Sequence, residues 1–266
     1  MLLVLVLLYV FPLCLQAYEL GAMGVRGNHE FEVIRWHHAL SNGMKAPPIG
    51  GEHFHIACAL SPREMKWIRN CPWYMSAASV AKAATTSSSS SGGGGAPPSS
   101  SPPDFSTSSS GGSQAPWNSL WSPKAPSPSS PSSGASGRLG PEDSEPGERE
   151  SSDLARTLFV HAGFVAGLKM QRQNPRLMMN MRSILPDGSA TAKHFSNWPW
   201  ARLWDGPESV VFGHDADRGL QLYDRATGID TGCVYGGRLT AYLLPEQKLV
   251  SVSAKRQYLA FKPKRT

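Results

Sequence analysis

The sequence predicts an α/β fold in one domain that a long polar insertion interrupts. Short apolar runs of strand length recur in the C-terminal part, and two of them end abruptly in Val160-His161-Ala162-Gly163 and Phe212-Gly213-His214-Asp215. Chemistry on loops just past strand ends is the usual arrangement in α/β proteins. Residues 81–152 are instead rich in Ser, Pro and Gly, a composition too polar to bury a core.

This composition divides the 266 residues into blocks 1–80, 81–152 and 153–266. We expect the first and last blocks to be two parts of one domain, and the middle block to be a disordered insertion. Loop closure costs about 0.6 kcal/mol per doubling of length, so lengthening a loop from about 5 to about 70 residues costs roughly 2 to 2.5 kcal/mol. A domain tolerates that cost.

Local patterns predict the individual elements. Ser61, Pro62 and Glu64 occupy the N-cap, first-turn and capping-box positions of a helix. Four short apolar runs have the length and composition of strands, and they cover residues 158–160, 210–212, 242–244 and 249–252.

The apolar segment 1–16 has several explanations. Leu2 to Leu15 is almost continuously apolar, with Pro12 as an interruption. It has the length of a signal-peptide core, but no basic residues precede it, and it is too short to span a bilayer comfortably. A buried strand, or an artefact of where the sequence begins, explains it equally well. We expect no stable membrane span.

Cysteine usage and charge bear on the compartment and on partners. The cysteines form no CxxC pair and no dense framework, which favours reduced thiols and hence the cytoplasm; they are Cys14, Cys58, Cys71 and Cys233. A secretory or membrane-anchored protein is the alternative that the apolar N-terminus supports. The net charge is +6, and its dense C-terminal part favours a solvated tail over steering of polyanions or nucleic acid.

Three motifs carry the chemistry, and each follows a short apolar run. They are Gly27-Asn28-His29-Glu30, His161-Ala162-Gly163 and Gly213-His214-Asp215. An Asn carbonyl oxygen and two neutral imidazoles form an uncharged half-site for zinc, iron or manganese. A second metal about 3.5 to 4 Å away would complete a clamp on a phosphoryl group, with an activated water as nucleophile. His29 then lies where it could protonate the leaving oxygen.

These motifs resemble those of the calcineurin-like metallophosphoesterases in the phosphoprotein-phosphatase superfamily, and specifically the diadenosine-tetraphosphatase-like (ApaH-like) branch. The branch signature is similar to residues 177–184 and 230–241, and to the spacing of Pro199-Trp200, Trp204 and Gly206-Pro207. The resemblance covers roughly 18–80 and 154–255. It implies a two-sheet β-sandwich flanked by helices, with the first strands missing here.

The resemblance also implies roles for individual residues. Asn28, His161 and His214 match metal ligands of the family, and His29 matches its general acid. Arg182 matches an arginine that holds phosphate oxygens, a role that suits the parallel donors of a guanidinium. The cofactors implied are divalent ions (Mn, Zn, Fe or Mg), two in the family and one in this chain.

One departure from the family pattern is as informative as the match. Family members carry Gly-Asp-x-His-Gly and Gly-Asp-x-Val-Asp-Arg-Gly ahead of Gly-Asn-His-Glu. These motifs supply the other metal ligands, an aspartate that orients the general acid, and a phosphate-binding arginine. Only 26 residues precede Gly27 here, and none is an aspartate. We expect an incomplete gene product, because the remaining motifs show little decay, or else a degenerate relative; as written, the chain should show negligible turnover.

The implied function is metal-dependent hydrolysis of phosphoanhydride or phosphoester bonds. The substrates to consider are dinucleoside polyphosphates, capped RNA 5′ ends and polyphosphate. A Ser/Thr protein phosphatase, with a phosphoprotein substrate, is one alternative. A catalytically incomplete pseudo-phosphatase that acts as a binding protein is the other.

For several other histidines and tryptophans we expect a structural role and no part in the chemistry. His53-Phe54-His55 has the alternation of a strand that could hold a metal, but the family places no ligand there. His37-His38 suits a helix surface, and His194 suits a polar connection without a chemical role. Packing is favoured over base stacking for Trp198, Trp200 and Trp204.

The insertion provides the first testable prediction. Replacement of residues 81–152 by a short Gly/Ser linker should leave the protease resistance of the folded core unchanged, because this composition cannot contribute a core. Limited proteolysis of both proteins measures this. A large loss of resistance would show that the insertion packs on the domain.

Overall fold

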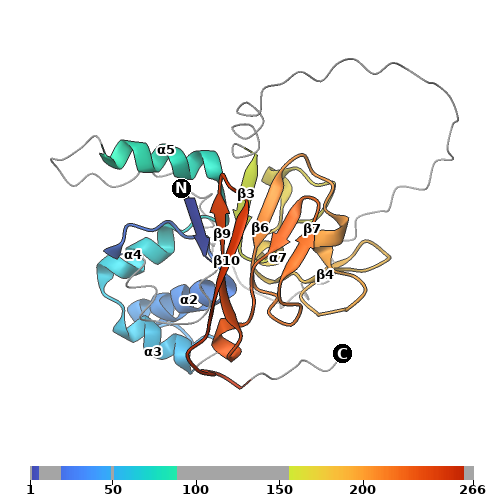
Figure 1. Cartoon of the computed structure of the whole chain (residues 1–266). Coiled ribbons are helices and arrows are strands. Elements are labelled where there is room, and N and C mark those ends of the chain that lie inside the picture. Colours follow the sequence, from blue (N-terminus) through green and yellow to red (C-terminus); the bar gives the residue numbers. More distant parts are fainter. Residues whose placement is uncertain (1, 6–18, 49–50, 89–155, 261–266) are drawn as a thin grey trace, which may run out of the picture.

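The computed structural model describes residues 2–5, 19–48, 51–88 and 156–260. Figure 1 shows the strands in the middle and on one side of the molecule, with helices α2, α3 and α4 grouped on the other side. The segments before and after the predicted insertion pair in one sheet, because β2 and β3 are neighbours in it. The mixed α/β fold that the sequence predicts is confirmed.

A five-stranded sheet forms the centre of the fold, in the order β2-β3-β6-β8-β7. Strands β3, β6 and β8 run parallel to one another, and the edge strands β2 and β7 are antiparallel to their neighbours. The strands span Tyr74–Ser76, Thr157–Val160, Ser209–Phe212, Ala226–Gly228 and Gln221–Tyr223, respectively, in sheet order. The register pairs Val160 with Phe212 and Phe212 with Gly228, so the three parallel strands end at one level.

The second sheet has the order β1-β9-β10 and is antiparallel throughout. Its strands are β1 (Leu2–Leu5), β9 (Arg238–Leu244) and β10 (Lys248–Ser253). The predicted runs 158–160, 210–212, 242–244 and 249–252 all lie in strands, which confirms those four predictions. For residues 2–5, the strand explanation of the apolar N-terminus agrees with the structure, and residues 6–18 lie outside the described part.

The two sheets pack against each other through a shared apolar layer. Alternate residues of a strand point to opposite faces, and Phe159 and Val211 point to the face where Ile229 and Leu244 lie. Leu244 belongs to β9 of the second sheet, so this layer fills the space between the sheets. The arrangement is the two-sheet sandwich that the resemblance implied.

The opposite face of the five-stranded sheet is covered by aromatic side chains and short helical segments. Trp200, Trp204 and Phe164 pack there on Val210 and Phe212. Trp200 stands edge-on to Phe212, with ring centroids 4.7 Å apart, a favoured aromatic geometry. The predicted packing role is therefore confirmed for Trp200 and Trp204, whereas Trp198 is 41% exposed. The segments on this side are η1 (Met170–Arg172), α7 (Pro175–Asn180), β4 (Ser183–Ile184), β5 (Ala190–Thr191) and η2 (Trp200–Leu203).

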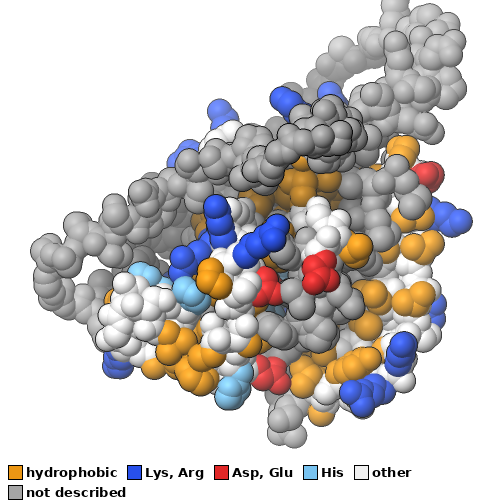
Figure 2. Space-filling view, turned by 90° about the vertical axis from the view of Figure 1, so that its left-hand side faces the viewer, with side chains coloured by type: hydrophobic (Ala, Val, Ile, Leu, Met, Phe, Trp, Pro, Cys, Tyr) orange, Lys and Arg blue, Asp and Glu red, His pale blue; other side chains and the backbone are white. Residues whose placement is uncertain are grey.

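Helices α2 (Asn28–Asn42), α3 (Glu52–Ala59) and α4 (Pro62–Asn70) share a small core of their own. Val33, Ala57 and Met65 form its buried centre, one from each helix. Figure 2 shows the outer face of this group, where hydrophobic side chains are interspersed with basic, acidic and histidine side chains. Such a mixture of side chains is typical of helices that face solvent.

The predicted helix start at Ser61 is confirmed in detail. The Ser61 hydroxyl accepts from the Glu64 amide at 3.3 Å, and the Glu64 carboxylate accepts from the Ser61 amide at 2.7 Å. This capping box satisfies two amides that the first turn of α4 would otherwise leave without partners.

Two sequence-based expectations need correction. His53-Phe54-His55 lies in helix α3 and not in a strand, since His53 and Ala57 share its buried face four residues apart. Helix α5 (Ala77–Ser88) continues beyond Ala81, where the insertion was expected to begin, because its Ala-rich sequence has a high helix propensity. Residues 89–152 of the insertion lie outside the described residues.

The remaining facts concern the cysteines, membrane-spanning helices and the last helical segment. Cys58, Cys71 and Cys233 are free thiols, as expected, and Cys14 lies outside the described residues. Among the described helices, none combines the length and apolarity that crossing a bilayer requires. The last helical segment, η3, spans Cys233–Tyr235.

Candidate metal centre

The three parallel strands deliver polar side chains to one edge of the sheet. His161 directly follows β3, His214 lies two residues beyond β6, and Asp230 lies two residues beyond β8. The amide of Gly213 donates to the carbonyl of His161 at 2.9 Å, which fixes the first two loops relative to each other. Carboxyl ends of parallel strands are where α/β proteins place ligand-binding groups.

The start of α2 lies against this edge. Gly27 is the N-cap of the helix, and its amide donates to the Glu30 carboxylate at 2.9 Å. A Cβ on Gly27 would lie 2.5 Å from Nδ1 of His161, so only glycine allows this approach. The close contact places Asn28 and His29, at the first turn of α2, beside the strand-end histidines.

Three donor atoms converge as a result. Oδ1 of Asn28 lies 2.8 Å from Nε2 of His161, and the same Nε2 lies 3.2 Å from Nδ1 of His214. Two ligand atoms about 2.0 to 2.1 Å from one tetrahedral zinc ion would lie about 3.3 Å apart. One amide oxygen and two imidazole nitrogens at these separations therefore fit a single divalent ion of the borderline class.

Burial keeps both histidines in the form that binds metal. Desolvation, together with the positive charge of Arg182 and the neighbouring His29, lowers the pKa of His161 to about 3. Desolvation and the nearby His161 and Arg182 lower the pKa of His214 well below 6.5. Neutral imidazole is the ligand form, so proton competition for these sites is weak at neutral pH. Nε2 of His214 also lies 3.2 Å from the carbonyl of Asn180 and can donate to it, which leaves Nδ1 free to accept.

His29 has a separate environment on the helical side. Its Nδ1 lies 2.9 Å from Nε2 of His53, and the two rings are nearly parallel, at 6°. Desolvation, followed by the neighbouring His53, lowers the pKa of His29 to about 4. The imidazole is therefore neutral at pH 7, and an entering phosphate would favour the charged form and raise this pKa.

Arg182 follows α7 and faces the His214 turn. Its Nη2 donates to the carbonyl of His214 at 3.1 Å, and its Nη1 donates to the carbonyl of Ala192 at 3.0 Å. A guanidinium carries five N–H donors, so these contacts leave others for anionic oxygens. The sequence-predicted residues Asn28, His29, His161, His214 and Arg182 are therefore brought to one edge of the sheet.

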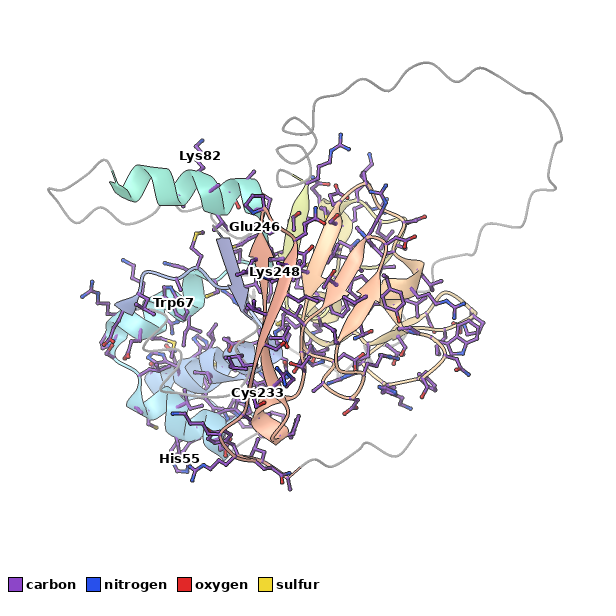
Figure 3. All side chains as sticks on the ribbon, in the orientation of Figure 1. His55, Trp67, Lys82, Cys233, Glu246 and Lys248 are labelled. Atoms are coloured by element: carbon purple, nitrogen blue, oxygen red, sulfur yellow. The ribbon has the colours of Figure 1, made fainter. Side chains whose placement is uncertain are left out.

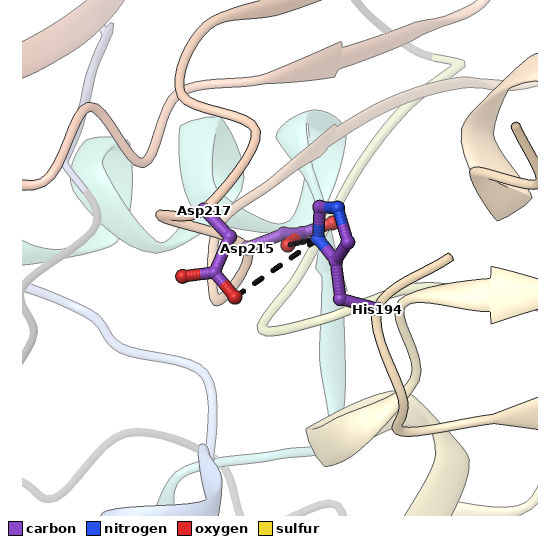
Figure 4. Close-up of side chains that lie close together, drawn as sticks. All are labelled: His194, Asp215 and Asp217. Carbon is purple, nitrogen blue, oxygen red and sulfur yellow. Dashed lines mark ion pairs between the residues drawn. The ribbon is translucent and has the colours of Figure 1, made fainter. Parts of the chain in front are cut away.

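A second cluster, which the sequence analysis missed, lies next to Arg182. Potential ligand atoms of His194, Asp215 and Asp217 all lie within 4.8 Å of one another (Figure 4). Asp215 is 2% exposed and pairs with Arg218 and with Nε of Arg182, the latter at 3.5 Å. Both arginines pair with Asp215, so its charge is already compensated and its carboxylate is a poor competitor for a cation.

These ion pairs hold the turn that carries His214. Arg218 donates to the carbonyl of Arg182 at 3.1 Å and to the Ser183 hydroxyl at 3.1 Å. His214 itself has φ of +67°, a left-handed conformation that costs energy for a non-glycine residue. His194 borders the carboxylate that anchors this turn, with Nδ1 3.6 Å from Oδ1 of Asp215, and the expectation that it has no chemical role stays a prediction. The sequence feature that could have indicated this cluster is Asp215, which follows His214 directly in the motif Gly213-His214-Asp215.

Asp230 is the third strand-end residue, and no chemical role was expected for it. Its Oδ1 accepts from the Gly232 amide at 3.2 Å, and its Oδ2 is buried without a hydrogen-bond partner among the described residues. Desolvation raises the pKa of Asp230 to about 6, and nearby Asp215 adds to the effect. A buried carboxylate of this kind is one of the features that mark functional sites.

The raised pKa gives Asp230 a definite effect on stability. Its stabilising contribution is present below the unfolded pKa of 3.8 and is lost as pH rises through about 6. For the metal-free protein, Asp230→Asn should therefore gain stability relative to the native sequence by about 2 to 2.5 kcal/mol between pH 4 and pH 8. Urea unfolding at both pH values measures this. Asp224→Asn, at an exposed position, is the control, and a pH-independent difference for Asp230→Asn would contradict the assignment.

Comparisons with known proteins agree with these motifs. No profile of a known protein family matches the chain. Similar curated proteins are asymmetrical bis(5′-nucleosyl)-tetraphosphatases PrpE. The one from Oceanobacillus iheyensis is 38% identical over 63 residues, which are 24% of this chain and 25% of the relative. The one from Bacillus thuringiensis is 32% identical over 112 residues, 40% of this chain and 44% of the relative.

The matched part therefore spans less than half the length of these curated relatives. A crystal structure of a protein named as a candidate diadenosine tetraphosphatase has a similar fold, with a TM-score of 0.55 and 22% identity. That similarity covers 92% of this chain and 73% of the other. Part of the chain is therefore similar in sequence to asymmetrical bis(5′-nucleosyl)-tetraphosphatases, and the chain has the fold of the solved structure.

Proposed function

We propose that this metal site serves the divalent-metal-dependent hydrolysis of phosphoanhydride bonds in dinucleoside polyphosphates, and that the 266 residues by themselves bind such a substrate but turn it over at a negligible rate. The convergence of Asn28 Oδ1, His161 Nε2 and His214 Nδ1 carries the proposal, because these neutral donors suit zinc, iron or manganese. The names of the similar bacterial proteins support a dinucleoside polyphosphate as substrate.

Residues of this chain perform distinct tasks in the reaction. Asn28, His161 and His214 would hold a divalent ion, which would polarise a phosphoryl oxygen and activate a water for attack. Arg182 donates to the carbonyls of Ala192 and His214, and it binds phosphate oxygens with its other N–H groups. A bound phosphate would raise the pKa of His29, and the imidazolium formed in this way would give a proton to the leaving phosphate oxygen. Asp215 and Arg218 keep Arg182 and the His214 turn in place.

A cavity next to the ion pairs of Asp215 offers room for a group beyond the phosphates of a substrate, since His194 and Arg218 belong to both, although Arg182 does not line it. It measures about 410 Å³ and is lined by polar and apolar side chains, among them His194, Asp217, Leu222 and Tyr223. This volume is within the range of small-molecule sites. A nucleoside fits it better than bare phosphate or polyphosphate does, since the carboxylate of Asp217 accepts hydrogen bonds and repels further phosphate.

The first test of the proposal is metal binding. The protein should bind one equivalent of Zn²⁺ or Mn²⁺ at this site, and His161→Ala should weaken binding about 100-fold or more, because a direct ligand is lost. Isothermal titration calorimetry and elemental analysis measure both. His38→Ala, at an exposed position of α2, is the matched control. Unchanged metal affinity in His161→Ala would show that His161 is not a ligand and would contradict the proposed metal site.

The second test concerns the arginine. Arg182→Lys should weaken vanadate or phosphate binding roughly 10- to 100-fold, because a lysine keeps the charge but loses the planar fork. Metal content should stay the same. Arg176→Lys, at an exposed position in the neighbouring helix α7, is the control, and equal anion affinity in the Arg182→Lys and native proteins would contradict this role.

The third test separates the substrate classes. The Mn²⁺-loaded protein should bind diadenosine tetraphosphate at least about ten times more tightly than a phosphoserine peptide, since only the former offers a nucleoside to the cavity. Turnover of both is followed in the same samples, with His214→Ala as the control. A preference for the peptide would favour a protein phosphatase. Robust turnover that His214→Ala abolishes would contradict the expected negligible activity.

A further inference from the structure

The cavity at the edge of the five-stranded sheet has an apolar side and a polar side. Leu220, Leu222 and Tyr223, which lie in the edge strand β7 or just before it, form most of the apolar side. Leu220 and Leu222 are 45% and 63% exposed, so they offer apolar surface to a ligand. The polar side comes from the loop after β6 and from the segment before η2, with the side chains of His194, Ser196, Asp217 and Arg218. A ligand that fits both sides has an apolar part and a part with hydrogen-bonding groups.

The sheet topology places this cavity beside the strand-end histidines. Strand β7 is antiparallel to β8, and the register pairs Gln221 with Gly228. Gly228 is the last residue of β8, so the start of β7 lies at the same edge of the sheet as His161 and His214. In the order β3-β6-β8-β7, β7 is two strands away from β6, which is roughly 10 Å at the usual strand spacing. The apolar side of the cavity therefore lies about two strand spacings from the His214 turn.

Asp217 is the acidic side chain that lines the cavity. Its side chain is 25% exposed, and among the ion pairs of the described residues its Oδ2 has one contact, with Nδ1 of His194 at 4.0 Å. Asp215, in contrast, pairs with both Arg182 and Arg218. A carboxylate offers about four lone-pair positions, so Asp217 can accept hydrogen bonds from a ligand in the cavity.

A series of short distances connects the phosphate-binding arginine with Asp217. Nε of Arg182 lies 3.5 Å from Oδ1 of Asp215, and Nδ1 of His194 lies 3.6 Å from the same oxygen. The same Nδ1 lies 4.0 Å from Oδ2 of Asp217 (Figure 4). In a nucleotide the sugar follows the phosphate and the base follows the sugar. With phosphate at Arg182, the sugar would therefore lie nearest to Asp217, and the base would reach the apolar side at β7.

We propose that Asp217 accepts hydrogen bonds from the 2′- and 3′-hydroxyls of a ribose whose base lies on the apolar side of the cavity. The site would then select ribonucleosides over their deoxy analogues. This inference rests on the proposed function for the position of the phosphates, and it adds which nucleosides the cavity accepts. Two neighbouring hydroxyls can donate to the two oxygens of one carboxylate. An analogue without them leaves that carboxylate desolvated and without donors, which is how a site of this kind rejects it.

Titrations of the metal-free full chain, followed by NMR of leucine methyl groups and histidine rings, test the proposal without metal or phosphate. Adenosine should shift the methyl signals of Leu220 and Leu222. The analogue 2′,3′-dideoxyadenosine should bind about 10- to 100-fold more weakly, because hydrogen bonds to a charged acceptor are lost. In Asp217→Ala the two ligands should bind within about threefold of each other, since the variant removes the partner of the hydroxyls. The ring signals of His55, which lies in the helical group away from β7, should stay unchanged (Figure 3).

The matched control is Asp224→Ala, an exposed residue in the turn between β7 and β8, which should keep the preference for adenosine. Equal affinity of the native protein for the two ligands would overturn the proposal. So would an unchanged preference in Asp217→Ala, or unshifted Leu220 and Leu222 signals at the solubility limit of adenosine. If Asp217→Ala does not fold, the two ligands still decide with the native protein and with Asp217→Asn. Loss of the expected metal or vanadate binding would instead contradict the proposed function, and neither enters this readout.

Discussion

The approach of the first turn of α2 to the end of β3 is the contact on which the site depends. Asn28 and His161 are separated by 133 positions, yet their side-chain donors lie 2.8 Å apart. Gly27 makes this possible, because any Cβ there would collide with the His161 ring and the Glu30 carboxylate. The same contact joins the segments on either side of the predicted insertion, as does the pairing of β2 with β3.

Charge around this contact is arranged in two zones. On one side lie neutral imidazoles whose pKa values burial lowers, with Arg182 as an added positive neighbour. On the other side, Asp215 is held between Arg182 and Arg218. Because the carboxylate there is already compensated, a cation gains more from the neutral nitrogen and oxygen donors than from the acidic cluster. This arrangement of charge is consistent with the proposal of metal at the strand ends and anionic oxygens at Arg182.

The sequence could predict the parts of the site that depend on local order. His161 and His214 follow recognisable strands, and carboxyl ends of parallel strands meet at one edge, so their convergence follows from topology. The start of α4 was predictable for a similar reason, since Ser61 and Glu64 interact three residues apart. The insertion's function and the roles of the site residues stay predictions.

The parts that sequence could not predict depend on tertiary packing. His53 meets His29 only because α3 packs on α2, and its alternation with His55 suggested a strand. His194 reaches Asp215 from a loop 21 positions earlier in the chain, with Nδ1 3.6 Å from the carboxylate. Burial raises the pKa of Asp230, and the neighbouring residues in the sequence do not predict that this side chain is buried.

The most direct test of the account is the position of a bound ion. Anomalous diffraction from crystals of the protein grown with Zn²⁺ or Mn²⁺ would locate the metal without reference to activity. The account predicts a peak within bonding distance of Asn28 Oδ1, His161 Nε2 and His214 Nδ1. A peak at His194, Asp215 and Asp217 in place of this one, or no peak beside His161 at saturating metal, would contradict it.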